Sequence, residues 1–293
     1  RQAAQGGGRE QGQRAWGGGG AMVMEVDADS ALDGFLATSS EARRKASDAL
    51  QRWQRADPGG LVASLAARVA SPALKPEART LAAVLLRKVL EKEGETLGCG
   101  SEPGAAWCRP GLGEALLEAL AAALPERALR RRAADAAAAA ASLQFARGRA
   151  WPEFALLLAR WCSGGRRERA VVLQILEQLR DEAEAEAAAE TGNVPCSYED
   201  GGRSGRAASL YALLAFLEDH AAALHGLLAA ALRDASGEPP ARDAAARVYV
   251  LCVAGPGVPA PLSAAVRDLA PVLAEAAAAR GVADAGLADL EEE

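Results

Sequence analysis

The chain has 293 residues, of which 50% are hydrophobic and only 4% aromatic, and it is rich in Ala and Leu with few β-branched residues. Because Ala and Leu have high helix propensity, this composition favours an all-α protein and disfavours a sheet protein. A formal net charge of −6 disfavours a nucleic-acid partner, whose phosphates need a basic face, and favours basic protein partners.

The cysteines and the hydropathy pattern bear on the environment of the chain. The five cysteines are scattered and contain no Cys-x-x-Cys pair, so we interpret them as reduced thiols in an intracellular protein. The longest Ala-rich run, residues 133–141, is interrupted by Asp135 and is too weakly apolar to span a bilayer. We therefore expect a soluble protein with no membrane partner.

Both ends of the sequence differ in composition from its middle. Residues 1–26 are mostly Gly, Gln and Arg, which bury too little apolar surface to offset the entropy of ordering, so we expect this segment to be disordered. The first residue is Arg, and we expect the natural start at Met22 or Met24, because helical sequence begins shortly afterwards. Residues 281–293 form an acidic tail.

Between these ends, residues 27–280 alternate apolar helical segments with breaks at Pro, Gly and Ser. The clearest segment is 76–92, where apolar residues recur from Ala78 to Leu90 at the spacing of one helix face. Such a face must be buried against neighbours, and we expect successive helices to pair as antiparallel hairpins. The predicted helices are 30–38, 41–55, 60–70, 76–92, 111–123, 126–145, 151–162, 166–190, 206–218, 220–234, 240–254 and 260–279.

A repeat appears when the second helices of the pairs are aligned on their first turns. Each carries an Arg after a small or acidic residue, and the shortest spacings are near the period of about 40 that two-helix HEAT repeats have. The longer spacings include Gly-, Ser- and Pro-rich stretches at 94–110 and 191–205, which we interpret as loop insertions. These Arg residues are expected to be structural and to bond loop carbonyls of the neighbouring repeat: Arg43, Arg79, Arg130, Arg169 and Arg242.

Several segments resemble one family, the karyopherin-β or importin-β nuclear transport receptors, and within it the N-terminal arch of the importin-4 and importin-5 type. The strongest match is Ala78–Leu90 (ARTLAAVLLRKVL), which is similar to the family's second-repeat helix. The segments 41–50, 130–135 and 150–154 match in the same order. The resemblance implies an α-solenoid of about five to six HEAT pairs wound as a right-handed superhelix, and a receptor that shuttles between cytoplasm and nucleus. Family receptors are roughly three times longer.

In a helix-pair superhelix the second helices line the concave wall, where extended partners lie. By resemblance, this is the surface that binds the GTPase Ran in its GTP form, and the family also binds cargo proteins and nucleoporins. The polar positions expected to contact the GTPase or another partner are Arg44, Lys45, Asp48, Arg87, Lys88, Arg132 and Asp135.

Acidic residues continue one predicted second helix, 166–190, beyond its apolar part. Glu177, Asp181 and Glu184 share one face of that helix. A basic cargo signal would find complementary charge there, and the alternative is a solvated helix end.

The sequence carries no arrangement that favours catalysis. His220 and His225 are five residues apart and so lie on different faces of a helix, which makes them a poor metal pair. No phosphate-binding loop, nucleophile elbow or His-Glu-x-x-His motif is present. We expect no enzyme activity, no cofactor and no metal. A generic HEAT scaffold in a cytosolic complex remains the alternative function, followed by a HEAT-fold enzyme.

Overall fold

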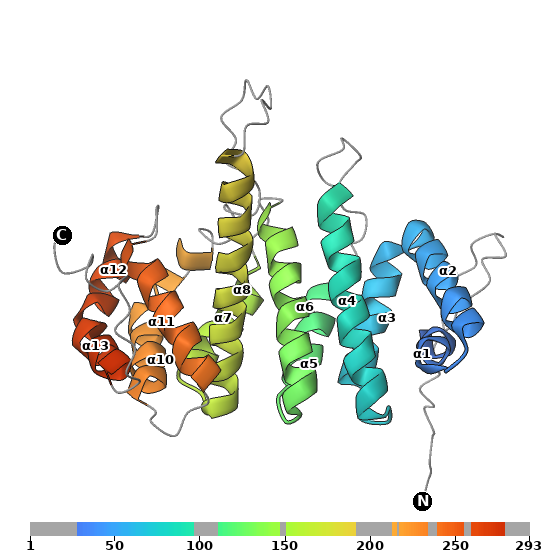
Figure 1. Cartoon of the computed structure of the whole chain (residues 1–293), viewed down its shortest axis with the longest axis horizontal. Coiled ribbons are helices and arrows are strands. Elements are labelled where there is room, and N and C mark those ends of the chain that lie inside the picture. The colour runs from blue at the N-terminus through green and yellow to red at the C-terminus, as the bar shows by residue number, and fades with distance from the viewer. Residues whose placement is uncertain are drawn as a thin grey trace, which may run out of the picture.

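The computed structural model describes residues 28–96, 111–146, 151–191, 213–215, 217–233, 239–254 and 259–278, and within these ranges it contains helices and no strand. The elements follow one another as a row of stacked helices (Figure 1). They are α1 (Ala28–Leu36), α2 (Ser40–Ala56), α3 (Pro58–Ala70), α4 (Pro76–Thr96), α5 (Leu112–Ala123), α6 (Arg127–Ala146), α7 (Pro152–Cys162), α8 (Arg166–Thr191), α10 (Ala221–Arg233), α11 (Pro239–Ala254), α12 (Ala260–Val266), the 3-10 helix η3 (Arg267–Leu269) and α13 (Ala270–Ala278).

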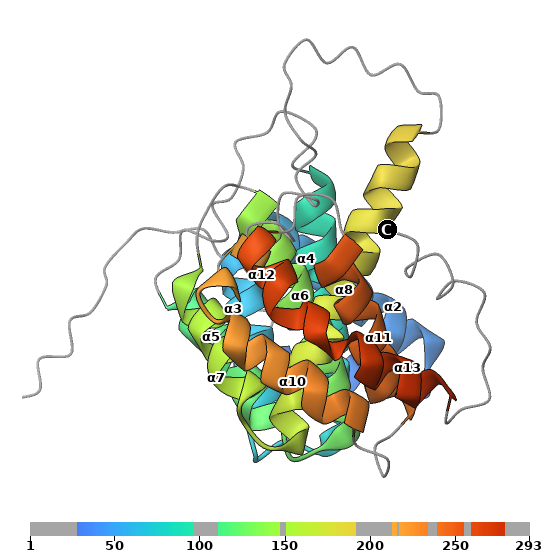
Figure 2. The same cartoon turned by 90° about the vertical axis from the view of Figure 1, so that its left-hand side faces the viewer.

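The helices form two layers of consecutive pairs. The pairs are α1 with α2, α3 with α4, α5 with α6, α7 with α8, and α10 with α11. The second helices α4, α6, α8 and α11 each pack on the next, while α3 packs on α5 and α7 packs on α10 in the other layer (Figures 1 and 2). This confirms the predicted all-α solenoid of antiparallel helix pairs. The first pair differs, because α2 packs mainly against α1 and α3.

The apolar stripe predicted for residues 76–92 lies in the core as α4. Leu86, Val89 and Leu90 are at most 2% exposed, and Leu85 is 7% exposed. Burial of each large aliphatic side chain contributes about 1.5–3 kcal/mol. The stripe therefore holds α4 between its own partner α3 and the next second helix, α6.

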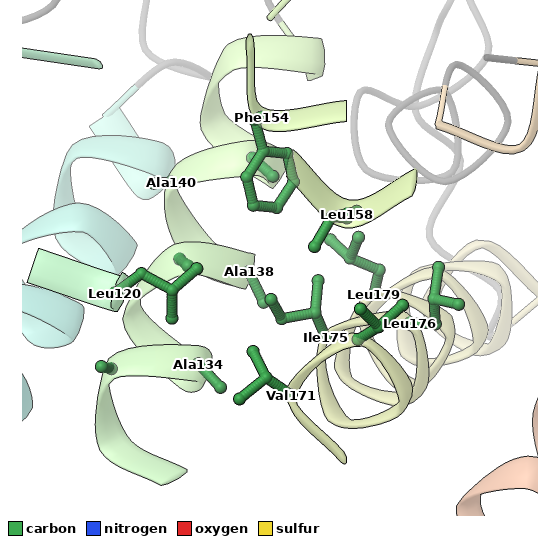
Figure 3. Packing of buried hydrophobic residues seen from close by; sticks show 14 of the residues in the cluster. Leu120, Ala134, Ala138, Ala140, Phe154, Leu158, Val171, Ile175, Leu176 and Leu179 are labelled. Atoms are coloured by element: carbon green, nitrogen blue, oxygen red, sulfur yellow. The ribbon is translucent and has the colours of Figure 1, made fainter. Parts of the chain in front are cut away.

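Helix α6 is covered on all sides along its central part. Every residue from Ala133 to Leu143 is buried, and most of them are Ala. Since the distance between packed helix axes depends on the side chains at the contact, a helix built from Ala lets its neighbours α4, α5 and α8 come close. Between α6, α7 and α8 the space is filled by the larger chains of Phe154, Leu158, Val171, Ile175, Leu176 and Leu179 (Figure 3).

Aromatic side chains join the first helices of the third and fourth pairs. Trp151 is buried, its ring stacks on that of Phe154 with centroids 4.7 Å apart, and it lies against Gly113 of α5. A Cβ at Gly113 would lie 3.2 Å from Trp151 Nε1, so the glycine allows this close approach. Trp151 thus links α5 to the start of α7.

The helix starts follow local sequence signals. The Asp57 carboxylate accepts a hydrogen bond from the Gly60 N–H at 2.8 Å, and Pro58 occupies the first turn of α3. Asp57 is therefore the N-cap of α3, and Pro58 is well placed after it because the first N–H groups of a helix have no partner within the helix. The helix consequently begins at Pro58, two residues before the predicted start at 60.

Other boundaries also differ from the prediction. The helix predicted over 260–279 is wrong as a continuous helix, because α12 ends at Val266 and η3 separates it from α13. Pro271 explains the break: it has no N–H to donate to residue 267, and its ring would clash with that carbonyl. Helix α4 runs to Thr96, beyond the predicted end at 92 and past the expected start of the insertion at 94.

Some predictions fall outside the described residues. These are the segment 1–26, the insertions over 97–110 and 192–205, most of the helix predicted at 206–218, and the tail 281–293. Residues 213–215, 217 and 218 are described and helical, and Leu213, Leu214 and Leu217 are fully buried. Within the described ranges, no helix combines the length and hydropathy that crossing a membrane requires.

Candidate protein-binding wall

Helices α4, α6, α8 and α11 pack on one another in one layer, which we call the second-helix wall. These four helices lie side by side in chain order (Figure 1). Each of these helices carries charged residues outside the core. Among the described residues of α6, the exposed ones lie in its first turns, around Arg131 and Arg132, because residues 133–143 are buried. Most of the predicted partner contacts belong to this layer.

Polar side chains connect each helix of the wall to the next. Arg87 Nη1 of α4 lies 3.5 Å from Asp135 Oδ2 of α6. Gln174 of α8 donates from Nε2 to Asp135 Oδ1 at 2.7 Å and to the Arg131 carbonyl at 2.9 Å. From α8 the series continues to α11, where Arg247 forms an ion pair with Glu177.

Asp135 is the centre of this series. Its side chain is only 9% exposed, and Arg132 Nη1 of its own helix lies 3.6 Å from the same Oδ2 that faces Arg87. A buried carboxylate is costly unless it is paired and hydrogen-bonded. The partners Arg87, Arg132 and Gln174 meet that requirement, so Asp135 joins three helices of the wall and is poorly accessible to a partner protein.

The other predicted residue of this group, Lys88, is exposed on α4 next to Arg87. Arg87 also donates from Nε to Glu91 Oε1 at 2.6 Å. The structure therefore brings Arg87, Arg132 and Asp135 together and leaves Lys88 at the solvent edge of the same cluster.

The predicted contacts on α2 lie apart from that cluster. Arg44, Lys45 and Asp48 are exposed, and Lys45 pairs with Glu41 of its own helix at 2.8 Å. Helix α2 approaches α4 near its C-terminal end, where Gln54 Nε2 donates to Glu93 Oε1 at 3.3 Å.

The three acidic residues predicted on α8 have different surroundings. Glu177 is paired with Arg247 and is 22% exposed. Asp181 is 55% exposed and accepts from Arg180 Nη2 at 2.7 Å. The side chain of Glu184 lies outside the described residues, although its helix continues to Thr191.

Arg79, at the start of α4, has the structural role expected from the repeat. It is 7% exposed, donates from Nε to the Val69 carbonyl at 2.9 Å and from Nη2 to the Ala122 carbonyl at 3.2 Å, and pairs with Glu126. Ala122 and Glu126 belong to the next pair, so the predicted bond to a neighbouring repeat is confirmed at Arg79. Arg130 instead bonds the Leu124 carbonyl in the loop of its own pair.

Sequence reasoning missed Gln174, Arg247 and Glu126, which complete the contacts between helices. One signal was available for Gln174: Asp135 and Gln174 are 39 residues apart, as are Gln54 and Glu93, and Asp29 and Arg68. Polar residues one repeat apart occupy equivalent positions on adjacent helices, so a polar pair with this spacing predicts a contact.

The groups that could support catalysis are dispersed or buried. Burial raises the pKa of the Cys162 thiol and of the Cys252 thiol to about 12 each, so neither is a nucleophile near neutral pH. His225 Nε2 lies 3.1 Å from Asp268 Oδ1, between α10 and η3. Within the described part of the chain, no cluster of three His, Cys, Asp or Glu side chains could hold a metal ion.

Comparison with known proteins finds similarity to solved structures alone: no protein-family model and no curated protein matches the sequence. The chain is similar to Kap95p, from a structure in which Kap95p binding induces the switch loops of RanGDP to adopt the GTP-bound conformation, with 14% identity, a TM-score of 0.48, and coverage of 91% of this chain and 34% of that chain. It is similar to Kap121p bound to RanGTP, with 19% identity, a TM-score of 0.39, and coverage of 87% and 27%. Kap121p bound to Nup53p gives 18% identity, a TM-score of 0.39, and coverage of 93% and 31%. These structural neighbours are karyopherins, and the chain spans about a third of their length or less.

Proposed function

We propose that this protein is a nuclear transport receptor-like protein that binds a Ran-type GTPase and cargo proteins through its HEAT superhelix and shuttles between cytoplasm and nucleus. Nucleoporins are a further partner class under this proposal. The distant similarity to Kap95p and Kap121p supplies candidate partners to test. The proposal itself rests on the second-helix wall and on the resemblance of α4, the helix that begins this wall, to the second-repeat helix of karyopherins.

The observation that carries the proposal is the position of that helix. Residues 78–90, which resemble the second-repeat helix of karyopherins, form the middle of α4, and α4 begins the second-helix wall. On α4, Lys88 is exposed and Arg87 is partly exposed. Arg87 faces the same Asp135 oxygen as Arg132 of α6. A partner lying over α4 and the start of α6 would contact these cations.

Cargo binding is proposed on α8. Asp181 is exposed, and Glu184 is three residues further along the same helix. Glu177 would bind a basic segment by exchanging its partner Arg247 for the incoming cation. If GTPase and cargo share or deform the same wall, the binding of one lowers the affinity for the other, and linkage requires the effect to be reciprocal.

The GTPase is tested by pull-down with Ran loaded with GTP or GDP. We expect retention of the GTP form and weaker retention by the Lys88→Glu variant. Arg160→Glu, an exposed position on the first helix α7, is the control and should bind as the parent does. Equal binding of both nucleotide forms, or none, would contradict the transport function and favour a cytosolic HEAT scaffold.

Cargo binding is tested with a labelled Lys-rich peptide in titrations at increasing salt. Asp181→Asn with Glu184→Gln should weaken binding, since charge complementarity is lost. Glu114→Gln with Glu118→Gln, two exposed carboxylates on α5, removes the same charge elsewhere and should leave binding unchanged. If both double variants bind equally well, α8 is a solvated helix and not a cargo site.

A further inference from the structure

The carboxylate of Asp135 is shared by two arginines. Arg87 Nη1 of α4 and Arg132 Nη1 of α6 lie 3.5 and 3.6 Å from the same oxygen, Oδ2. Oδ1 accepts the hydrogen bond from Gln174. One carboxylate therefore faces two cations. Arg87 has Glu91 as a second acidic partner, whereas Arg132 has no second carboxylate among the described residues.

More cations surround this centre without an acidic partner. Lys88, Lys92 and Arg131 are exposed, and none of their side chains forms an ion pair within the described ranges. Arg132 is half exposed and has only its contact with Asp135, which at 3.6 Å is too long for a direct hydrogen bond. Its guanidinium forms no hydrogen bond with another described residue.

The two helices place these cations close together. The contact between Arg87 and Asp135 sets these two turns of α4 and α6 at the same level. Lys88 is at that level. Arg131 and Arg132 lie about one turn before Asp135 on α6, and Lys92 lies about one turn after Lys88 on α4. A turn rises about 5.4 Å and packed helix axes are about 8–10 Å apart. We call these four residues, together with Arg87, the α4–α6 basic cluster.

We infer that the α4–α6 basic cluster binds a short acidic peptide segment of a partner protein. A carboxylate arriving between α4 and α6 would complete the half-satisfied guanidinium of Arg132, and Arg recognises carboxylates through paired N–H donors. Asp135 already holds the two guanidiniums in position, so less side-chain entropy is lost on binding than at free cations.

The surroundings favour a peptide over a nucleic acid. Glu91 and Glu93 lie on the same helix as the cluster, Asp181 is exposed on the neighbouring helix α8, and the whole chain has a net charge of −6. An extended phosphate backbone running beyond the cluster would meet these carboxylates and be repelled. A segment of a few acidic residues is short enough to stay on the cations.

This inference goes beyond the proposed function, because the binding depends on no nucleotide and on no GTPase. It is tested on the full chain with a fluorescein-labelled peptide of about four glutamates, short enough to stay on the cluster, by fluorescence anisotropy at low and high salt. We expect salt-sensitive binding. The variant Lys88→Gln with Arg131→Gln should weaken it by about three- to tenfold, because each removes one charge contact and neither breaks an ion pair among the described residues.

The matched control is Arg160→Gln with Arg233→Gln, which removes the same charge from exposed positions on α7 and α10. It should bind like the parent, and unchanged melting temperatures should show that both variants are folded. Absence of salt-sensitive binding would overturn the inference, as would equal weakening in both variants. A single-stranded oligonucleotide of equal charge that binds more tightly than the peptide would also overturn it.

Discussion

Arg79 of α4 and Glu126, the residue before α6, form an ion pair that joins two successive helix pairs. The same guanidinium bonds the carbonyls at the ends of α3 and α5. One buried side chain therefore satisfies groups from three helix ends.

Replacing Arg79 with Ala should destabilise the protein by about 2–4 kcal/mol, since it leaves two carbonyls and a carboxylate without their donor. Urea unfolding followed by circular dichroism measures this change. Arg43→Ala, the exposed Arg at the start of α2, should change the free energy of unfolding by less than about 0.5 kcal/mol. Similar losses at both positions would refute the role assigned to Arg79.

Leu85→Asp should unfold at least the region around α4. Leu85 is 7% exposed in the continuous core, and an unpaired carboxylate there costs more than about 4 kcal/mol. Leu36→Asp changes a side chain that is 48% exposed and should be tolerated. A thermal melt of Leu85→Asp that matches the parent would contradict the packing of α4.

Two glycines inside helices should respond to Ala in opposite directions. A Cβ at Gly34 would lie 2.9 Å from the Ala46 Cβ, whereas a Cβ at Gly226 would meet nothing within 4 Å. Gly34→Ala should destabilise the α1–α2 contact by about 1–3 kcal/mol, and Gly226→Ala should stabilise α10 by about 0.5–1 kcal/mol.

Adding Ala46→Gly to Gly34→Ala should recover part of the stability, because it removes the clashing methyl group. Chemical denaturation of these three variants and of the parent measures the changes in the free energy of unfolding. Stabilisation by Gly34→Ala would mean that α1 and α2 are further apart than described.

The protein should lose stability in alkaline solution through its buried thiols. Burial raises the pKa of Cys162 and of Cys252 from 9.0 to about 12. Between these pH values the native state keeps protons that the unfolded chain has lost, so the free energy of unfolding falls as pH rises from about 9 towards 12. Burial also raises the pKa of Tyr249 above 10.0, which acts in the same direction.

Urea midpoints measured from pH 8 to pH 11 test this dependence. The variant Cys162→Ala with Cys252→Ala should be less stable at pH 8, where its smaller side chains leave cavities, but should lose less stability on going to pH 11. A slope equal to that of the parent would exclude the thiols as its cause.

The fold could be predicted because each helix pair depends on local patterns. Apolar spacing at 3 and 4 residues located α4, and Pro or Asp at helix starts marked the boundaries to within a few residues. The break at η3 could also have been predicted from Pro271, whose effect on residue 267 is local. The departure of α2 from the second-helix wall was not predictable, because it depends on how α1 and α3 pack against it.

The candidate site was predicted less well, because burial depends on neighbours in space. Asp135 has the sequence context of an exposed charge in a run of Ala, yet Arg87 and Gln174 from two other helices cover it. The prediction grouped Arg44 and Arg132 on one wall, whereas the structure puts them on helices that do not pack closely together. Spacing along the chain identified the helices but not the partners of their side chains.

The covered stretch of α6 from Ala133 to Leu143 has a mechanical consequence. A solenoid bends where adjacent helices can slide or tilt. Here α4, α5 and α8 cannot move closer to α6 without overlap, and they cannot move away without opening voids. The middle of the rod should therefore be stiff, and any spring-like flexing that accommodates a bound protein must be taken up by the pairs on either side of it.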